Sequence, residues 1–112
     1  MSNSESMNEH YQTARNKLQD ARNMVEPGSD KDTEIGAAIA ALDLANINRI
    51  QAEYSAGSAN LQEVVDKLES VRAGIEVNPI GGVLDDINGA LESVNALAEM
   101  INDLLTDPPP SG

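Results

Sequence analysis

The sequence predicts an all-α protein, a small antiparallel four-helix bundle. Four segments of roughly 20 to 25 residues repeat apolar residues at intervals of three and four, and none alternates with a period of two. Clusters of Pro, Gly and Ser at residues 27–30, 55–58 and 78–82 separate them and are typical of turns. We expect helices over residues 5–25, 32–55, 59–76 and 80–106 in one domain, 1–107. Residues 108–112 should form a disordered proline-rich tail.

The fourth segment has the most regular pattern. Its apolar residues follow an unbroken heptad seam: Leu84, Ile87, Leu91, Val94, Ala98, Ile101 and Leu105. Apolar residues one position earlier widen the stripe, as a multi-helix bundle requires: Val83, Ala90, Leu97 and Leu104. The third segment follows the same rule with Leu61, Val64, Leu68, Val71 and Ile75.

The first and second segments depart from this regularity in opposite directions. The first seam is weaker, because two of its members are alanine: Met7, Tyr11, Ala14, Leu18, Ala21 and Val25. A three-helix core with a loosely packed N-terminal helix is therefore the alternative fold. The second segment is apolar on more than one side, with Asp43 and Asn46 as its polar side chains between residues 35 and 47. We expect a central helix that packs against several neighbours.

Capping residues mark the ends of these helices. Either Ser29 with Asp32, or Asp32 itself, can cap the second helix, and Asn60 with Glu63 has the spacing of a capping box for the third. Gly57 suits a left-handed stop for the second helix. Asn78 followed by Pro79 suits the start of the fourth helix. Gly81 and Gly82 weaken that first turn, so regular helix can begin near Val83.

A weak internal echo relates the two halves of the chain. Residues 16–22 align with residues 66–72 at an offset of 50, and Ala41-Leu42-Asp43 aligns with Ala90-Leu91-Glu92 at an offset of 49. The fold can therefore also be interpreted as two related helical hairpins. The other interpretation is a chance match between amphipathic helices of similar composition.

Composition and charge exclude several classes of function. The 112 residues carry 19 acidic and 7 basic side chains, a net charge of −12, and no cysteine. Thiolate zinc sites and disulfides are therefore excluded, and direct binding to nucleic-acid phosphates is disfavoured. No apolar run approaches the length of a membrane span, and the N-terminus is polar. We expect a cytoplasmic protein with no membrane contact, no metal and no cofactor.

Catalytic motifs are also missing from the sequence. His10 is the one histidine, in a polar segment with no sign of a pocket, and we expect it at the surface. Asp43, if buried, needs a counter-charge such as Arg22, Arg49 or Arg72; otherwise it lies on an exposed strip. We expect no enzymatic activity.

Two sets of polar residues on the fourth segment are candidate binding sites. The acidic set consists of Asp85, Glu92, Glu99 and Asp103. It forms either a solubilising face or a docking face for a basic protein. The second set is Asn88, Asn95 and Asn102, which recur every seven residues beside the seam. Such flanking positions specify helix–helix interfaces, so we expect a self-association or partner edge there.

Three functions follow from these features. The favoured one is a non-catalytic protein-interaction module whose acidic face binds a basic protein, as inhibitors, antitoxins and immunity proteins do. The alternative is a structural or assembly subunit, or a chaperone of a secretion or phage apparatus, that self-associates through its heptad seams. A mimic of nucleic-acid charge is a further alternative. We expect a homo-oligomer, a dimer or larger, because the seams can also pair between chains.

Overall fold

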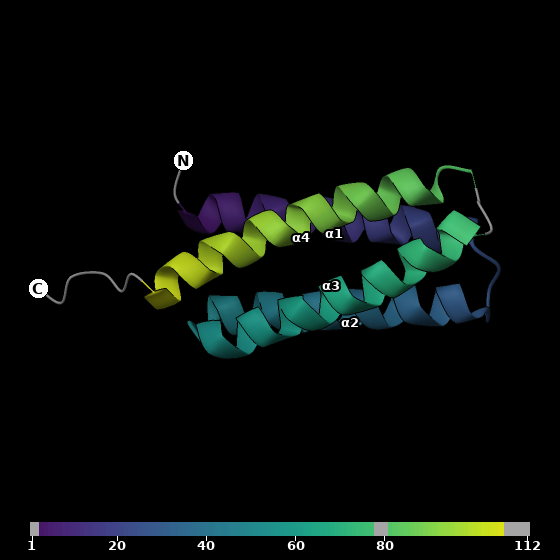
Figure 1. Ribbon diagram of the computed structural model, residues 1–112. Coiled ribbons are helices and arrows are strands. Elements are labelled where there is room, and N and C mark those ends of the chain that lie inside the picture. Colours follow the sequence, from purple (N-terminus) through teal and green to yellow (C-terminus); the bar gives the residue numbers. More distant parts are fainter. Residues whose placement is uncertain (1–2, 78–80, 107–112) are drawn as a thin grey trace, which may run out of the picture.

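The computed structural model describes residues 3–77 and 81–106, which fold into four α-helices. These are α1 (Asn3–Met24), α2 (Asp30–Ile50), α3 (Tyr54–Val77) and α4 (Val83–Thr106). Successive helices run in opposite directions and lie side by side, as Figure 1 shows. The predicted all-α four-helix bundle is confirmed.

The helices form a closed ring in which each contacts two neighbours. α1 packs against α4 and α2, and α3 packs against α2 and α4. The α2/α3 and α1/α4 interfaces are the most extensive, and the α1/α2 interface is the smallest. The predicted seam of α1 is buried throughout, from Met7 to Val25. The alternative of a three-helix core is therefore wrong, because α1 shares its seam with the common core.

The core is aliphatic, and it confirms the predicted seams of α1 and α3. In α4 the buried residues all belong to the predicted wide stripe, and they come from both its seam and its widening: Val83, Ile87, Ala90, Leu91, Val94, Leu97 and Ile101. Leu84 and Ala98 are half-buried, and Leu105 is 41% exposed. A wide apolar stripe includes adjacent positions that lie about 100° apart around the helix axis. The sequence alone therefore does not decide which of the two adjacent positions is buried.

α2 is not the central helix that its composition predicts. It lies at a corner of the ring like the other three helices and has two neighbours. Its core face buries Ile35, Ala38, Ile39, Leu42 and Ala45. Its opposite face is left to solvent, and three large aliphatic side chains there are about half exposed or more: Leu44, Ile47 and Ile50.

The turn between α2 and α3 comes earlier than predicted. α2 ends at Ile50, and Ala52 adopts the left-handed conformation with φ of 61°. The N–H of Glu53 donates to the carbonyl of Asn48, and that of Ala52 to the carbonyl of Arg49. This is the Schellman pattern that ends many helices, with alanine at the position that glycine usually holds. The absence of glycine there is why the sequence pointed to a later stop.

Two predicted caps therefore fall inside α3. Gly57 is helical and buried, and a Cβ there would lie 3.5 Å from the carbonyl oxygen of Ala45. Asn60 also lies within the helix, and its Oδ1 accepts a hydrogen bond from Nδ2 of Asn48 at 2.7 Å. Both residues join α3 to α2 near the turn, and neither ends or begins a helix.

The other boundaries agree better with the sequence. Ser29 caps α2 as predicted, since its Oγ accepts from the N–H of Asp32. α4 begins at Val83, the later of the two predicted starts, after Gly82 with φ of 83°. The predicted Asn78–Pro79 cap and the predicted tail at 108–112 lie outside the described residues. No helix in the described part of the chain is long and apolar enough to cross a membrane.

Candidate functional site

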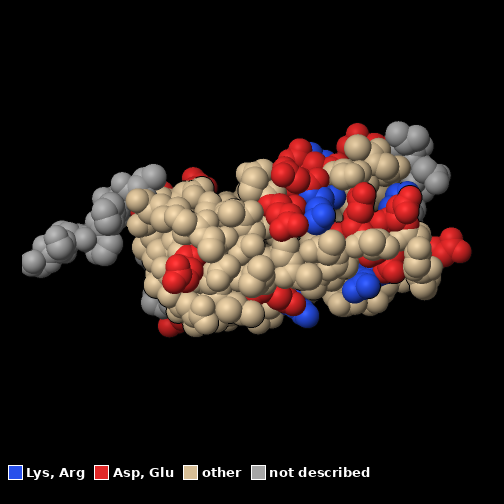
Figure 2. All heavy atoms as spheres, turned by 90° about the horizontal axis from the view of Figure 1, so that it is seen from below, with Lys and Arg blue, Asp and Glu red and all other residues tan. Residues whose placement is uncertain are grey.

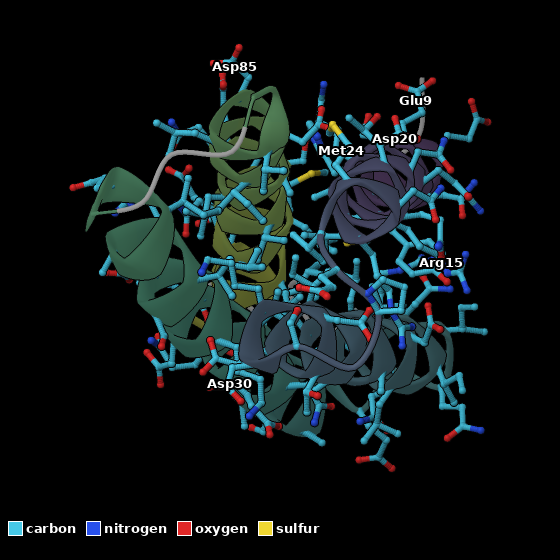
Figure 3. The ribbon with its side chains drawn as sticks, turned by 90° about the vertical axis from the view of Figure 1, so that its right-hand side faces the viewer. Glu9, Arg15, Asp20, Met24, Asp30 and Asp85 are labelled. Atoms are coloured by element: carbon cyan, nitrogen blue, oxygen red, sulfur yellow. The ribbon has the colours of Figure 1, made fainter. Side chains whose placement is uncertain are left out.

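The predicted acidic stripe is placed on the surface of α4. Asp85, Glu92, Glu99 and Asp103 are all exposed. Figure 3 shows Asp85 pointing away from the bundle. Within residues 3–77 and 81–106, no Lys or Arg lies within ion-pair distance of these four carboxylates. The stripe is therefore a set of solvated negative charges along one helix.

The three asparagines of α4 lie along its α3 side. Asn88 Oδ1 accepts from Nη1 of Arg72 at 3.3 Å, and Asn102 Oδ1 accepts from Oγ of Ser58 at 3.0 Å. Arg72 and Ser58 both belong to α3, so two of the three amides link neighbouring helices of the same chain. Asn95 is exposed. Self-association through this edge stays a prediction.

His10 lies in a shallow groove of about 400 Å³ between α1 and α4. Lys17, Gly89, Glu92, Ser93 and Ala96 line the groove with it. A Cβ on Gly89 would lie 2.7 Å from Cδ of Lys17, so the glycine leaves room for the lysine side chain. The expectation that no hollow lies near His10 is wrong, because residues of α4 that are about 80 positions away complete it.

A polar cluster joins α1 to α2 beside the middle of α2. Asp43 Oδ1 accepts hydrogen bonds from Tyr11 Oη at 2.7 Å and from Arg15 Nε at 2.9 Å. Partial burial raises the pKa of the Tyr11 hydroxyl, and its hydrogen bond to Asp43 raises that pKa further. The counter-charge of Asp43 is therefore Arg15 and none of the three arginines that the sequence suggested. Both charged side chains remain over a third exposed, so the pair contributes little, about 0–1 kcal/mol.

Two of the arginines that were expected near Asp43 form hydrogen bonds elsewhere. Arg49 is 7% exposed, and its Nε and Nη2 donate to Oδ1 of Asn46 one turn earlier. Arg22 Nε donates to Oδ1 of Asp32 at 2.8 Å, and the N–H of Gly28 donates to Oδ2 of Asp32. These contacts lower the pKa of the Asp32 carboxyl, the Arg22 hydrogen bond most of all. Both clusters hold helix ends and the α1–α2 loop in place.

The sequence interpretation missed the outer face of α2. Six uncharged residues follow this face at intervals of 4, 3, 4, 3 and 4: Thr33, Ala37, Ala40, Leu44, Ile47 and Gln51. All six are exposed except Ala37, which is half-buried. Leu44 and Ile47 are 48% and 50% exposed, and Ile50 at the edge is 66% exposed. We call Ala40, Leu44, Ile47 and Ile50 the α2 strip.

The α2 strip lies in a part of the surface that carries few charges. Residues 44–62 contain one basic residue, Arg49, and one acidic residue, Glu53, so the segment has no net charge. Figure 2 shows the face formed by α2 and α3, with charged side chains gathered toward one end and largely uncharged atoms over the other. The uncharged end is where α2 ends and α3 begins.

A signal for this face was present in the sequence. The second seam, from Thr33 to Gln51, lies on the side of the helix opposite the buried one. Apolar residues on both sides of a helix also predict burial between several helices, which is the interpretation that the structure corrects. A bundle of four helices arranged in a ring gives each helix one buried side only, so the second seam faces solvent.

Comparisons with family models, with curated proteins and with solved structures found no match to this chain. Among the described residues, no group of three or more His, Asp or Glu side chains is arranged to hold a metal ion. The surface and the polar clusters of the bundle are therefore the basis for a proposal about function.

Proposed function

We propose that this chain is a non-catalytic protein-interaction module that binds a protein through the outer face of α2. The observation that carries this proposal is the α2 strip, three large aliphatic side chains left about half exposed or more on a helix whose other side already fills the core. Burial of each such side chain is favourable by about 1.5–3 kcal/mol when complete. Contiguous apolar surface of this kind marks interaction sites on soluble proteins.

The polar clusters support the same proposal, because their side chains already form hydrogen bonds within the bundle. Asp43 accepts from two donors of α1, Asp32 accepts from Arg22 and from the loop, and Asn46 accepts twice from Arg49. None of these groups needs a substrate to complete its hydrogen bonds. The outer face of α2, by contrast, gains from being covered.

Site-specific photo-crosslinking in the producing cells tests this function. A benzophenone amino acid replaces Ile47 in the strip, and the same amino acid replaces Gln12, an exposed residue of α1, in the control. We expect a defined adduct from position 47 and none from position 12. The captured protein is identified by mass spectrometry and its binding is reproduced with purified components, where L44K should abolish it. Equal crosslinking from both positions, or none from position 47, contradicts the proposal.

The acidic stripe of α4 supports a second candidate function, the binding of a basic protein. Its four carboxylates are exposed and lack ion-pair partners in the described part of the chain. Charges of this kind attract a basic partner at low salt and lose that effect as salt rises.

A lysine-rich peptide is a suitable probe for the stripe. Neutralising it with D85N, E92Q, E99Q and D103N should weaken binding of the peptide at least tenfold at low salt, measured by fluorescence anisotropy. The matched control removes the same charge from exposed acids elsewhere, with E9Q, D20N, E63Q and E69Q. An equal loss in both variants would assign the effect to net charge alone and contradict a docking role for the stripe.

A further inference from the structure

We propose that the occupant of the α2 strip is a second copy of this chain, which packs α2 against α2 in antiparallel orientation. The proposal rests on the proposed function and names its partner. It follows from three properties of the outer face of α2: heptad spacing, neutrality, and position at one end of a strongly acidic molecule.

The spacing of the outer face suits another helix of the same kind. Residues at intervals of four and three form the a and d positions through which two helices interlock. In an antiparallel pair, a positions of one helix meet d positions of the other. Leu44 of one copy then packs on Ile47 of the second, and the same contact occurs again across the two-fold axis. Ala40 next to this centre lets the two backbones approach closely.

The charge distribution makes the outer face of α2 a more favourable place for two copies to meet than the acidic faces of the molecule. Each chain carries a net charge of −12, so two copies repel one another when their acidic faces meet. The segment from residue 44 to residue 62 has one exposed acid, Glu53, and one buried base, Arg49, so the repulsion between two copies is small there. Two copies can therefore meet here with few carboxylates near the contact.

The same distribution decides the orientation. The uncharged part of the α2/α3 face lies at one end of the bundle, and the charged part lies at the other (Figure 2). Parallel pairing of α2 would place the two charged ends side by side. Antiparallel pairing centred between Leu44 and Ile47 overlaps the uncharged ends and directs the charged ends away from each other.

The acidic residue beside the strip does not oppose this contact. Asp43 lies one residue before Leu44, and its carboxylate already accepts hydrogen bonds from Arg15 and Tyr11. Its charge is therefore balanced within its own chain, and Ile50 of the other copy can lie beside it in the antiparallel arrangement. The contact remains small, and small interfaces are typical of transient complexes. We therefore expect a weak and reversible dimer.

Sedimentation equilibrium of the purified full chain tests the proposal. We expect a monomer–dimer equilibrium between 11.9 kDa and twice that mass, with dimerisation strengthened as salt rises from about 0.05 M to about 0.5 M. The variant L44K/I47K should raise the dissociation constant at least tenfold, although its two added positive charges reduce the repulsion between copies. Far-ultraviolet circular dichroism checks that it remains helical, as expected for exposed positions.

The matched control adds the same two charges on α4, as N88K/N95K. Because the added charges also reduce the repulsion between copies, we expect this variant to dimerise at least as readily as the wild type. A wild-type chain that stays monomeric at millimolar concentration in high salt overturns the second-copy proposal, as does a dimer that only the α4 variant disrupts. If the wild type is monomeric while position 47 crosslinks to a different protein, the proposed function stands and the second copy is excluded.

Cysteine pairing tests the orientation, since the chain has no cysteine of its own. In the antiparallel arrangement, an equimolar mixture of L44C and I47C should form disulfide-linked dimers at least tenfold faster than either variant alone. Faster pairing within each variant alone would indicate parallel helices and overturn the antiparallel arrangement.

Discussion

Ala52 adopts a backbone conformation that alanine rarely takes. Its φ of 61° places it at the left-handed position of the Schellman turn that ends α2. A left-handed conformation costs a residue with a Cβ roughly 1–2 kcal/mol, and glycine avoids this cost. The loop residue Gly28, with φ of 81°, shows the usual choice.

We therefore expect A52G to stabilise the bundle by about 0.5–1 kcal/mol, after the greater chain entropy of glycine in the unfolded state is subtracted. Urea unfolding followed by circular dichroism measures the change. The control is Q51G, at a neighbouring residue with φ of −84°, which should destabilise the fold because no strain is relieved there. A destabilised A52G would show that the turn is not strained.

Asp32 makes stability depend on pH in the acidic range. Its pKa is lowered in the folded state by Arg22 and by the N–H of Gly28, relative to an unfolded value of about 3.9. Its contribution to stability is therefore present above the unfolded pKa and is lost as pH falls through the folded pKa. D32N should be less stable than the wild type at neutral pH.

The difference between D32N and the wild type in unfolding free energy should shrink as pH falls below about 4. Urea unfolding between about pH 7 and about pH 3 measures it. A difference that stays constant over this range would show that Asp32 does not stabilise the folded state through its charge.

Single residues were predictable where their partners are close in sequence. Ser29 was found as a cap because its acceptor role depends on Asp32, three residues later. The partners of Asp43 lie 28 and 32 residues away, on another helix. The sequence does not show how the two helices are aligned, so it does not distinguish among several possible arginine partners. The left-handed turn at Ala52 was not predicted because the residue there is alanine and not the glycine that usually adopts this conformation.

α4 shows how far a heptad pattern defines the buried face of a helix. Leu97 and Leu105 are nearly equivalent by sequence, because they belong to two adjacent lines of the apolar stripe. In the bundle, Leu97 is fully buried, and Leu105 is 41% exposed. We expect L97A to destabilise the fold by about 2–5 kcal/mol and L105A by less than about 1 kcal/mol.

Denaturant unfolding of the two variants measures this difference. Both substitutions remove the same atoms from the same helix, so helix propensity cancels in the comparison. Equal losses of stability would contradict the burial of Leu97 and the exposure of Leu105. The seams of α1 and α3 are buried as predicted, because those stripes are narrow and leave one choice of face.

The arrangement of the whole bundle explains why the proposed docking surface was not predicted. Four segments with apolar stripes and short loops were enough to predict an antiparallel four-helix bundle, and that prediction is confirmed. The predicted candidate sites were polar residues of α4, whereas the strongest surface feature is apolar and lies on α2. Which side of α2 is buried depends on its neighbours, and the periodicity of one helix does not contain that information.

The uncharged end of the α2/α3 face matters because the rest of the molecule is strongly acidic. The net charge of −12 keeps copies apart wherever acids are exposed, and residues 44–62 are neutral. Close association with another copy through the outer face of α2 therefore costs little electrostatic energy. We propose that this is the face that becomes covered.

Nuclear magnetic resonance of the amide groups at increasing protein concentration tests whether this face is covered. We expect the amide chemical shifts of residues 40–52 and of the first turn of α3 to change with concentration, while those on the outer face of α4 stay constant. Changes centred on Asn88, Asn95 and Asn102, or no changes up to millimolar concentration in high salt, would contradict it.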